Sequence, residues 1–597
     1  MASATPSIRS SVDEAEGVRC RDGGGYGAGV GALASLTISR ACTRFSHRED
    51  MRHRVKLWTV FTLAVALLAP ACGRDAATPK AKSGGTVAFG LLHDPFTLDG
   101  ALAVSIPSFM AVSQIFETLV RTEPGTTRVA PRLARSWESA DGRTWTFHLQ
   151  TGVRFHDGTP LDAAAVCFNF ERWYHFTGLL QTSAKWQYVF GAFATPSDQA
   201  PPETLYGGCE ARAADQVVLR LTRPYGGLLA ALTQPAFGIA SPDALRRYDA
   251  DHMSGSKEAP VFDSPFGTEH PIGTGPFRFK SWVRNERLEV VRNDDYWAGR
   301  PGPDRIIFRP IPDGTARRQA VQSGEIQGYA PVDAGDVSLL RDNGIRLVEL
   351  PALNTGVVGL NLARPPLDNL KVREAIAHAL NRDAMVKAKF PAGTEVASQL
   401  IPPALPGHGA DVPEYRYDPD LAKRLLAESG VSSPTLEFSY PTYSPGQSEP
   451  LLPDAEGMFL AFKADLERAG FRVTPKPTPW ADYYNRALRN GEVQVFIAGL
   501  GAGRPSPEEL FTNLEVKNPA LGFDNQDVMG TLRQAKTEVD ADKQAALYQK
   551  VNRALMESLL MVPYAHVKVY FALSPKVDGF AVSAAGSDPD FTAVRFT

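Results

Sequence analysis

The chain has 597 residues, of which 43% are hydrophobic and 22% are charged, a composition typical of a soluble globular protein. Its 63 Lys and Arg against 66 Asp and Glu give a net charge of -3. This balance leaves no basic excess for binding nucleic acid, and it is not acidic enough for a disordered solvating tail. At roughly 150 residues per domain, the length alone suggests about three to five domains.

A basic and then apolar segment begins at Met51. The apolar run over residues 57–69 is shorter than the roughly 18 to 20 apolar residues that a membrane-spanning helix needs. Small residues follow it up to Cys72, and this ending resembles a bacterial lipobox. We therefore predict a signal peptide over residues 51–71 and a lipid attached to Cys72. The alternative is ordinary cleavage near Ala71, without a lipid.

Two stretches flank this signal. Residues 1–50 contain glycine-rich sequence without periodicity, and a signal peptide so far inside a chain would be unusual. We therefore expect translation to start at Met51 and residues 1–50 to be a mis-assigned, disordered extension. Residues 72–83 are small and polar, so we expect them to form a tether.

The chain has five cysteines: Cys20, Cys42, Cys72, Cys167 and Cys209. None lies in a C-x-x-C pair, and we predict no metal site. Outside the cytosol thiols oxidise, so we predict a disulfide between Cys167 and Cys209. That bond would close a loop of roughly forty residues and contribute about 3 to 4 kcal/mol. The alternative is two buried free thiols.

The body of the chain shows both strand and helix periodicity. Residues 144–149 alternate strictly, which predicts a strand with Trp145, Phe147 and Leu149 on one face. Helix and strand patterns alternate farther on: helices over 370–380 (with Asp368 as the expected cap) and 459–469, a strand over 471–473, a helix over 480–490 and a strand over 493–497. This alternation indicates α/β units in the C-terminal half.

Catalytic motifs such as G-x-S-x-G, H-E-x-x-H and the P-loop are absent from the sequence. The glycine-rich stretch 499–503 follows the predicted strand, as a dinucleotide-binding loop would. However, Pro505 and Pro507 oppose a phosphate-binding helix that starts at this loop. We predict no catalytic residues and no cofactor.

A series of short motifs runs in order over about residues 84–582. It includes Gly84-Gly85-Thr86-Val87, Gln114-Ile115-Phe116-Glu117-Thr118-Leu119-Val120 (as a first helix), Gly152-Val153-Arg154-Phe155-His156-Asp157-Gly158, Gly273-Thr274-Gly275-Pro276-Phe277, Asn293-Asp294-Asp295-Tyr296-Trp297, Pro365-Pro366-Leu367-Asp368 and Tyr417-Asp418-Pro419. In this order the motifs resemble the family 5 extracellular solute-binding proteins of ABC importers, the oligopeptide, dipeptide and nickel receptor group. Each motif is weak alone, but so many in order are specific.

The resemblance implies an α/β, periplasmic-binding-protein-like fold of class II, large cluster. Two lobes would be joined by a hinge and would enclose the solute by closing, and a further subdomain would be inserted in the first lobe. The implied segments are 84–115, 265–352 and 563–597 for lobe I, 116–264 for the inserted subdomain and 353–562 for lobe II.

The sequence departs from this family's peptide receptors at residues 499–507, where those receptors commonly read Gly-Trp-x-Ala-Asp-Tyr-Pro-Asp-Pro. In them the first Asp can hold the peptide's amino terminus, but here Leu500 replaces the Trp and Gly503 that Asp. A buried ammonium needs a carboxylate partner. We therefore predict that a short peptide with a free N-terminus is not the best ligand, unless Glu508 substitutes. Arg504 would meet an anionic or sugar-like group or, alternatively, lie on the surface.

The resemblance also suggests which residues line the pocket. We predict contacts from Asn354, Thr355, Trp480, Tyr484, Gly499, Leu500, Gly501 and Arg504. Trp480 could instead pack in the core of lobe II. For Arg373, a grip on the solute and a role in pinning one helix to its neighbour stay open.

By resemblance, the protein is a receptor and not an enzyme. It would capture a peptide-like or other small solute and deliver it to the permease subunits of an ABC importer. We expect an exported monomer, on the outer face of the cell membrane as a lipoprotein or periplasmic, that contacts the membrane only through its lipid. The alternatives are an exported hydrolase of cell-wall peptides or glycans, and a surface signalling receptor with the same fold.

Overall fold

The computed structural model describes residues 84–196, 202–257, 259–443, 449–484, 490–501, 503–511 and 521–597, without the side chains of Ala481 and Tyr484. The chain divides into two units, residues 1–75 and 76–597, and every described residue belongs to the second. The predicted extension, signal peptide, Cys72 and tether lie outside the described residues. Within the described ranges, no helix has the length and apolar character to cross a membrane.

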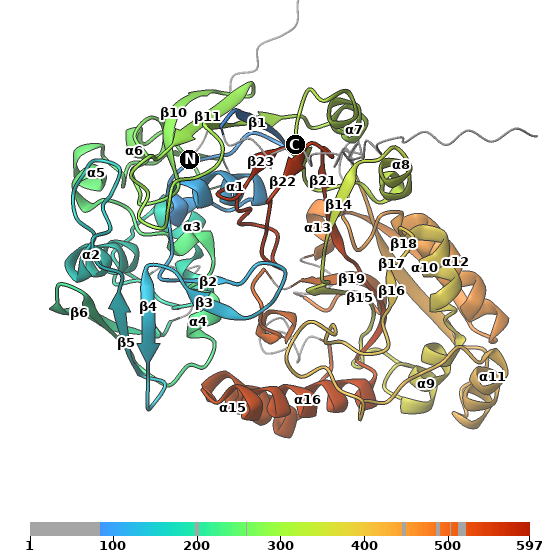
Figure 1. The fold of residues 1–597 in the computed structure, drawn as a ribbon. Helices are drawn as coiled ribbons and strands as arrows, with labels where there is room; N and C mark the ends of the chain where they lie inside the picture. Colours follow the sequence, from blue (N-terminus) through green and yellow to red (C-terminus); the bar gives the residue numbers. More distant parts are fainter. Residues whose placement is uncertain are drawn as a thin grey trace, which may run out of the picture. The chain divides into compact units, whose positions relative to one another are not determined.

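Seven strands form one sheet in the order β10-β11-β12-β1-β13-β21-β14, and we call the part of the molecule built on it lobe I (Figure 1). The strands are β1 (Thr86–Leu91), β10 (Phe277–Val283), β11 (Arg287–Arg292), β12 (Arg305–Pro310), β13 (Gly328–Tyr329), β14 (Arg346–Leu350) and β21 (Val569–Leu573), and the accompanying helices are α1 (Ile106–Ile115), α7 (Gly314–Ser323) and α8 (Val337–Asp342). In its core, the ring of Phe89 lies 6.3 Å from that of Phe308 and 5.5 Å from that of Phe591.

Between β1 and β10 the chain forms a second, four-stranded sheet of order β4-β5-β7-β6, and we call this part the inserted subdomain. Its strands are β4 (Ala134–Glu138), β5 (Thr144–Leu149), β6 (Tyr206–Ala213) and β7 (Gln216–Leu221), and its helices are α2 (Ala163–Tyr174), α3 (Leu179–Ser183), α4 (Leu228–Ala231) and α5 (Pro242–Arg247). As predicted, Trp145, Phe147 and Leu149 of β5 are all buried.

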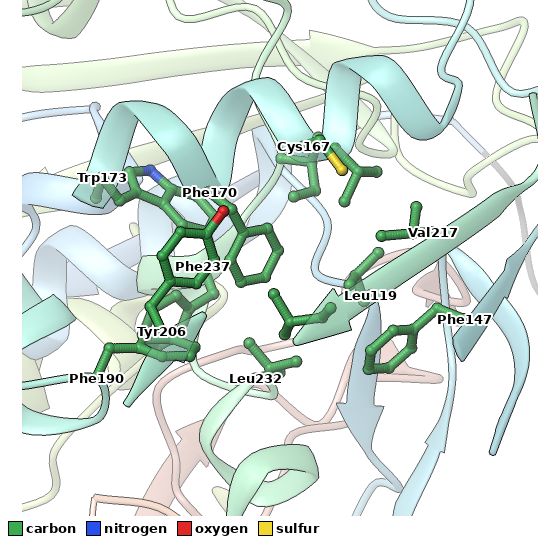
Figure 2. Close-up of a cluster of buried hydrophobic side chains, with 14 of the residues drawn as sticks. Leu119, Phe147, Cys167, Phe170, Trp173, Phe190, Tyr206, Val217, Leu232 and Phe237 are labelled. Atoms are coloured by element: carbon green, nitrogen blue, oxygen red, sulfur yellow. The ribbon is translucent and has the colours of Figure 1, made fainter. Parts of the chain in front are cut away.

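Helix α2 covers one face of this four-stranded sheet (Figure 2). Its side chains Phe170 and Trp173 belong to the same buried cluster as Phe147, and Figure 2 shows them between the helix and the strands. The structure contains a disulfide between Cys167 of α2 and Cys209 of β6. The bond thus ties the covering helix to the edge strand of the sheet.

Six strands form the third sheet, of order β16-β20-β15-β19-β17-β18, on which lobe II is built. They are β15 (Asn354–Leu360), β16 (Glu395–Val396), β17 (Thr435–Thr442), β18 (Arg472–Pro479), β19 (Val495–Gly501) and β20 (Met561–His566). The helices are α9 (Leu370–Ala379), α10 (Arg382–Lys389), α11 (Pro419–Glu428), α12 (Ala455–Arg468), α13 (Trp480–Tyr484), α15 (Gln526–Thr537) and α16 (Ala541–Ser558).

Smaller elements complete the described part. They are β2 (Val120–Thr122), β3 (Val129–Pro131), β8 (Ser254–Gly255), β9 (Pro260–Val261), β22 (Val577–Asp578), β23 (Arg595–Phe596), α6 (Pro265–Thr268) and the short 3-10 helices η1 (Gly100–Leu102), η2 (Lys185–Tyr188), η3 (Pro235–Phe237) and η4 (Ala334–Asp336). Lobe I and lobe II are joined at two crossings, from β14 to β15 and from β20 to β21. These two connections are the hinge.

Several sequence expectations are corrected by the structure. The helix expected over 114–120 ends at Ile115, because α1 lies earlier, after its cap Ser105. The cap of α9 is Asn369 and not Asp368, since the Asn369 side chain accepts a hydrogen bond from the amide of Lys371. The strand expected to end at residue 497 continues to Gly501, because it pairs with β15 along its whole length.

The expected end of lobe II at residue 562 falls inside a strand. β20 continues to His566 and pairs with β15 and β16, so residues 563–566 belong to the six-stranded sheet. Arg373 pins a helix: its guanidinium donates to the carbonyl of Ser558 at the end of α16, at 2.9 Å, and to that of Leu367, at 2.7 Å.

Candidate functional site

The strand directions place one edge of the lobe I sheet beside the hinge. β1 runs parallel to β12 and β13, so all three end at the same edge. The turn between β10 and β11 lies at this edge too, because Leu288 at the start of β11 pairs with Phe308 near the end of β12. β14 also ends there and continues into β15. In open α/β sheets, ligands bind at the carboxyl ends of the parallel strands.

A pocket of about 640 Å³ opens at this edge, between lobe I and the inserted subdomain. It is lined by His93, Asp94, Pro95, Phe96, Val104, Thr182, Ser183, Pro260, Phe262, Arg284 and Asn285. The loop that follows β1 supplies the first four, the start of α1 is close to Val104, and the hairpin turn of β10 and β11 supplies the last two. Among the described residues of lobe II, none lines it.

The charged groups of this pocket are paired with one another. Trp282 Nε1 donates to Asp94 Oδ1 at 3.0 Å, and Arg284 Nη1 lies 3.8 Å from Asp94 Oδ2. The Arg284 guanidinium stacks 3.5 Å from the centre of the Trp282 ring and donates to the carbonyl of Pro95. Burial lowers the pKa of Arg284, and the charge of Asp94 offsets part of this effect. The pocket therefore presents apolar walls around a compensated ion pair.

Large apolar side chains are unusually exposed around this pocket. Phe96 is 46% exposed and Val104 40%, although both line the pocket. Ile106, Val261 and Val283, which lie within two residues of lining residues, are also exposed. Exposed apolar surface concentrated around a concavity is typical of a binding site.

On lobe II, the structure brings together five of the predicted residues. β15 and β19 pair in antiparallel register, so that Asn354 lies opposite Gly501, Thr355 opposite Leu500, and Gly356 opposite Gly499. Because Asn354 starts β15 just after the hinge crossing, this end of the ladder lies at the lobe II edge nearest to the hinge.

The side chains of three of them do not point to a pocket. Thr355 is fully buried and donates to the carbonyl of Leu400 at 2.8 Å, and Leu500 is 3% exposed within an apolar cluster of lobe II. Asn354 uses both polar atoms on the backbone of Val567, which fixes β15 to the end of β20. These side chains hold the sheet and the hinge together in this structure, and their predicted contacts with a solute stay a prediction.

The glycines of this ladder differ in the space around them. A Cβ on Gly499 would lie 2.7 Å from Leu451, whereas a Cβ on Gly501, at the end of β19, would meet none of the described residues within 4 Å. The ring of Trp480, at the end of β18, is half-buried and lies 5.5 Å from that of Tyr443, at the end of β17. The side chain of Tyr484 lies outside the described part.

Arg504 is buried, so the alternative of a surface location is wrong. It is 3% exposed, and its guanidinium lies 3.5 Å from Glu508 and 3.2 Å from Glu509. Burial alone would lower its pKa, but Tyr225 and the two carboxylates raise the pKa above its ordinary value. Within the described part of the chain, Arg504 Nη1 has no hydrogen-bond partner, yet the charge is compensated by Glu508 and Glu509.

Glu508 is also occupied by its own chain. Its Oε2 accepts a 2.7 Å hydrogen bond from the hydroxyl of Tyr225, and its Oε1 lies 3.6 Å from Lys536 Nζ. Burial would raise the pKa of Glu508, but the charges of Arg504 and Lys536 outweigh it and lower the pKa. A carboxylate with these partners is not free to hold the amino group of a solute.

The lining of the lobe I pocket was missed by the sequence interpretation. Its residues come from four separate segments, near 93–104, 182–183, 260–262 and 284–285. The loop that follows the first predicted strand was the one available signal, because loops at the carboxyl edge of such a sheet carry ligands.

Comparison with known proteins decides what kind of protein carries this site. Residues 128–520 match the family model described as Bacterial extracellular solute-binding proteins, family 5 Middle. The chain belongs to this family. The structure of this family 5 protein agrees, because its mixed α/β sheets and its match to solved structures support a two-lobed, periplasmic-binding-protein-like fold.

Curated relatives cover most of this family 5 protein. It is 29% identical over 491 residues to the dipeptide-binding protein of Escherichia coli (strain K12), and this alignment covers 79% of this chain and 87% of the relative. It is 28% identical over 558 residues to heme-binding protein A of Haemophilus influenzae, and this alignment covers 89% of this chain and 98% of the relative. These relatives are solute-binding proteins, which favours solute capture over the hydrolase and signalling alternatives.

Solved structures show the same fold. HbpA2 from Haemophilus parasuis superimposes with a TM-score of 0.75 at 25% identity, over 86% of this chain and 100% of that one. NikA from Brucella suis, in complex with Fe(III)-EDTA, gives a TM-score of 0.69 at 24% identity, over 86% of this chain and 100% of that one. Among the described residues of our family 5 protein, no cluster of three His, Cys, Asp or Glu could hold a metal ion.

Proposed function

We propose that this family 5 protein captures a small solute in the lobe I pocket and the adjoining space between the lobes, and delivers it to the permease subunits of an ABC importer. The single observation that carries this is the pocket of about 640 Å³, with apolar walls, at the carboxyl edge of the sheet. Small-molecule sites commonly measure roughly 300 to 1,000 Å³ and are lined mainly by apolar groups. The relatives named for dipeptides and heme support a small solute, including a peptide-like one.

The chemistry of the site favours a solute with an apolar or aromatic group. Phe96, Val104 and Phe262 offer apolar surface, and the ion pair of Asp94 and Arg284 leaves no net charge to attract an ion. Glu508 is engaged by Tyr225, so it does not take the place of the carboxylate that Gly503 lacks. The solute therefore is not held through a free α-amino group at this position.

The remaining expectations belong to the same proposal. The protein acts as a monomer without catalysis and without a cofactor, and it works outside the cytoplasm. Its membrane contact is a lipid on Cys72, after removal of residues 51–71. Labelling of cells with a fatty acid analogue tests the anchor: the label is expected on the wild type and absent from Cys72→Ser, and a labelled Cys72→Ser protein would contradict it.

The decisive experiment identifies the solute and then tests the pocket. Native mass spectrometry of the protein from its own cells identifies the compound that co-purifies, and calorimetry then measures its affinity. Phe96→Ala is expected to weaken binding roughly tenfold or more, because an apolar contact is lost. Leu460→Ala, which removes an exposed leucine from α12, is the matched control and is expected to bind normally. Equal affinities of both variants would refute the pocket assignment.

A further inference from the structure

The inserted subdomain touches lobe II at a place far along the chain from the hinge. Tyr225 follows β7 of the inserted subdomain, and its hydroxyl donates a 2.7 Å hydrogen bond to Glu508, which follows β19 of lobe II. Both residues are 7% exposed. The contact therefore buries a phenol and a carboxylate between two parts that the chain connects only through lobe I.

A backbone contact lies beside this hydrogen bond. The amide of Gly226 donates to the carbonyl of Lys536, near the end of α15, at 2.8 Å. The two backbones approach so closely that a Cβ on Gly226 would lie 1.7 Å from the carbonyl oxygen of Glu538. Figure 1 shows α4, which follows Gly226, beside α15. Only glycine at this position permits the approach.

We propose that the contact of Tyr225 and Gly226 with Glu508 and Lys536 is a clasp that holds lobe II against the inserted subdomain when the lobes close. The lobes move about the crossings near Asn354 and His566, so opening must separate the clasp. Because every group in it belongs to the protein, the clasp stabilises the closed form before any solute contributes. A solute then has to supply only part of the free energy of closure.

The charges around Glu508 make such a clasp reversible. When Tyr225 departs, Glu508 keeps Arg504 at 3.5 Å and Lys536 at 3.6 Å, and both belong to lobe II. Opening therefore leaves no carboxylate without a counter-charge, which would otherwise be costly. Opening breaks the hydrogen bond between Tyr225 and Glu508 and the backbone hydrogen bond between Gly226 and Lys536. In the open form, hydrogen bonds to water replace them.

Two variants and a control test the clasp in the full-length protein, with native mass spectrometry verifying that the samples contain no solute. Small-angle X-ray scattering then measures the radius of gyration. Gly226→Ala wedges the contact apart and is expected to increase the radius. Gly335→Ala is the matched control, because its Cβ would meet nothing within 4 Å and its backbone needs no positive φ. It is expected to leave the radius unchanged.

Tyr225→Phe tests the hydrogen bond without a steric change. The loss of a hydrogen bond to a charged group is expected to shift the ratio of open to closed molecules roughly tenfold or more. Hydrogen exchange of the Gly226 amide should rise accordingly. A solute-free wild type as expanded as Gly226→Ala would overturn the proposal. So would unchanged scattering in Gly226→Ala together with unchanged exchange in Tyr225→Phe. Neither readout depends on the solute, so the clasp can fail while the proposed function stands.

Discussion

The carboxylate of Glu117 accepts a 2.7 Å hydrogen bond from the hydroxyl of Tyr296, and this contact joins the start of the inserted subdomain to lobe I. Arg132 Nε donates to the same oxygen at 3.0 Å, and Thr274 Oγ1 and Trp297 Nε1 donate to the other oxygen, both at 2.8 Å. The Glu117 side chain is fully buried, so its four donors replace water completely.

We expect Glu117→Gln to lower the free energy of unfolding by roughly 3 to 5 kcal/mol, because Arg132 would lose its buried counter-charge. The midpoint of urea denaturation measures the change. Glu123→Gln breaks an exposed pair with Arg128 and serves as the control, for which less than about 1 kcal/mol is expected. Equal effects of the two variants would show that the buried network around Glu117 adds no more to the free energy of unfolding than an exposed ion pair does.

Replacement of both Cys167 and Cys209 by alanine should destabilise the inserted subdomain. The disulfide joins residues 42 positions apart, and closure of a loop of that length corresponds to about 4 kcal/mol in the chain-entropy model. Denaturation with and without a reductant provides the measurement. The reductant should weaken the wild type and leave the double variant unaffected. A reductant-insensitive wild type would argue against a stabilising bond.

The stability of the protein should depend on pH through His566. Burial lowers its pKa to about 4, and its ring Nδ1 lies 3.1 Å from Thr355 Oγ1. Because an unfolded histidine titrates near 6.5, the unfolded chain binds the extra proton between about pH 6.5 and pH 4. Stability from this group is therefore complete above pH 6.5 and declines as the pH falls through that window.

At pH 5 the loss due to His566 is expected to be roughly 2 kcal/mol. His566→Gln should remove this part of the pH dependence, as measured by urea unfolding at pH 7 and pH 5. His175→Gln alters an exposed histidine and should keep the wild-type slope. His156, whose pKa burial also lowers to about 4, contributes equally to the wild type and to both variants. If the unfolding free energy of His566→Gln fell between pH 7 and pH 5 as much as that of the wild type, His566 would not be the source of this pH dependence.

Because position 503 is a glycine and not an acidic residue, we predict that the protein discriminates against peptides with a free amino terminus. Free dipeptides and tripeptides should bind more weakly than the native solute, and Gly503→Asp should improve their binding, because a carboxylate would then face their ammonium group. Calorimetry with a peptide and its N-acetylated form is the measurement, and Gly335→Ala is the control. Sub-micromolar binding of free peptides by the wild type, unaffected by acetylation, would count against this account.

The sequence by itself determined the family and much of the local structure. The alternation over 144–149 was sufficient to predict strand β5 and its buried face, because successive side chains of a strand point to opposite faces and only one face here is apolar. The resemblance placed both Asn354 and Gly501 among the expected pocket contacts, which stays a prediction. The structure shows that the two residues pair directly although they are far apart in the chain.

Tertiary structure alone decided which way the residues at these strand ends face. Thr355 and Leu500 lie opposite each other in the ladder, and both side chains point into lobe II, because β15 and β19 are central strands with buried faces. The pocket depends on four segments that meet only at the edge of the lobe I sheet, and the clasp depends on a phenol that crosses from the inserted subdomain to Glu508. Local periodicity reports on neighbours within one element, whereas these contacts arise from the packing of elements that are distant in the chain.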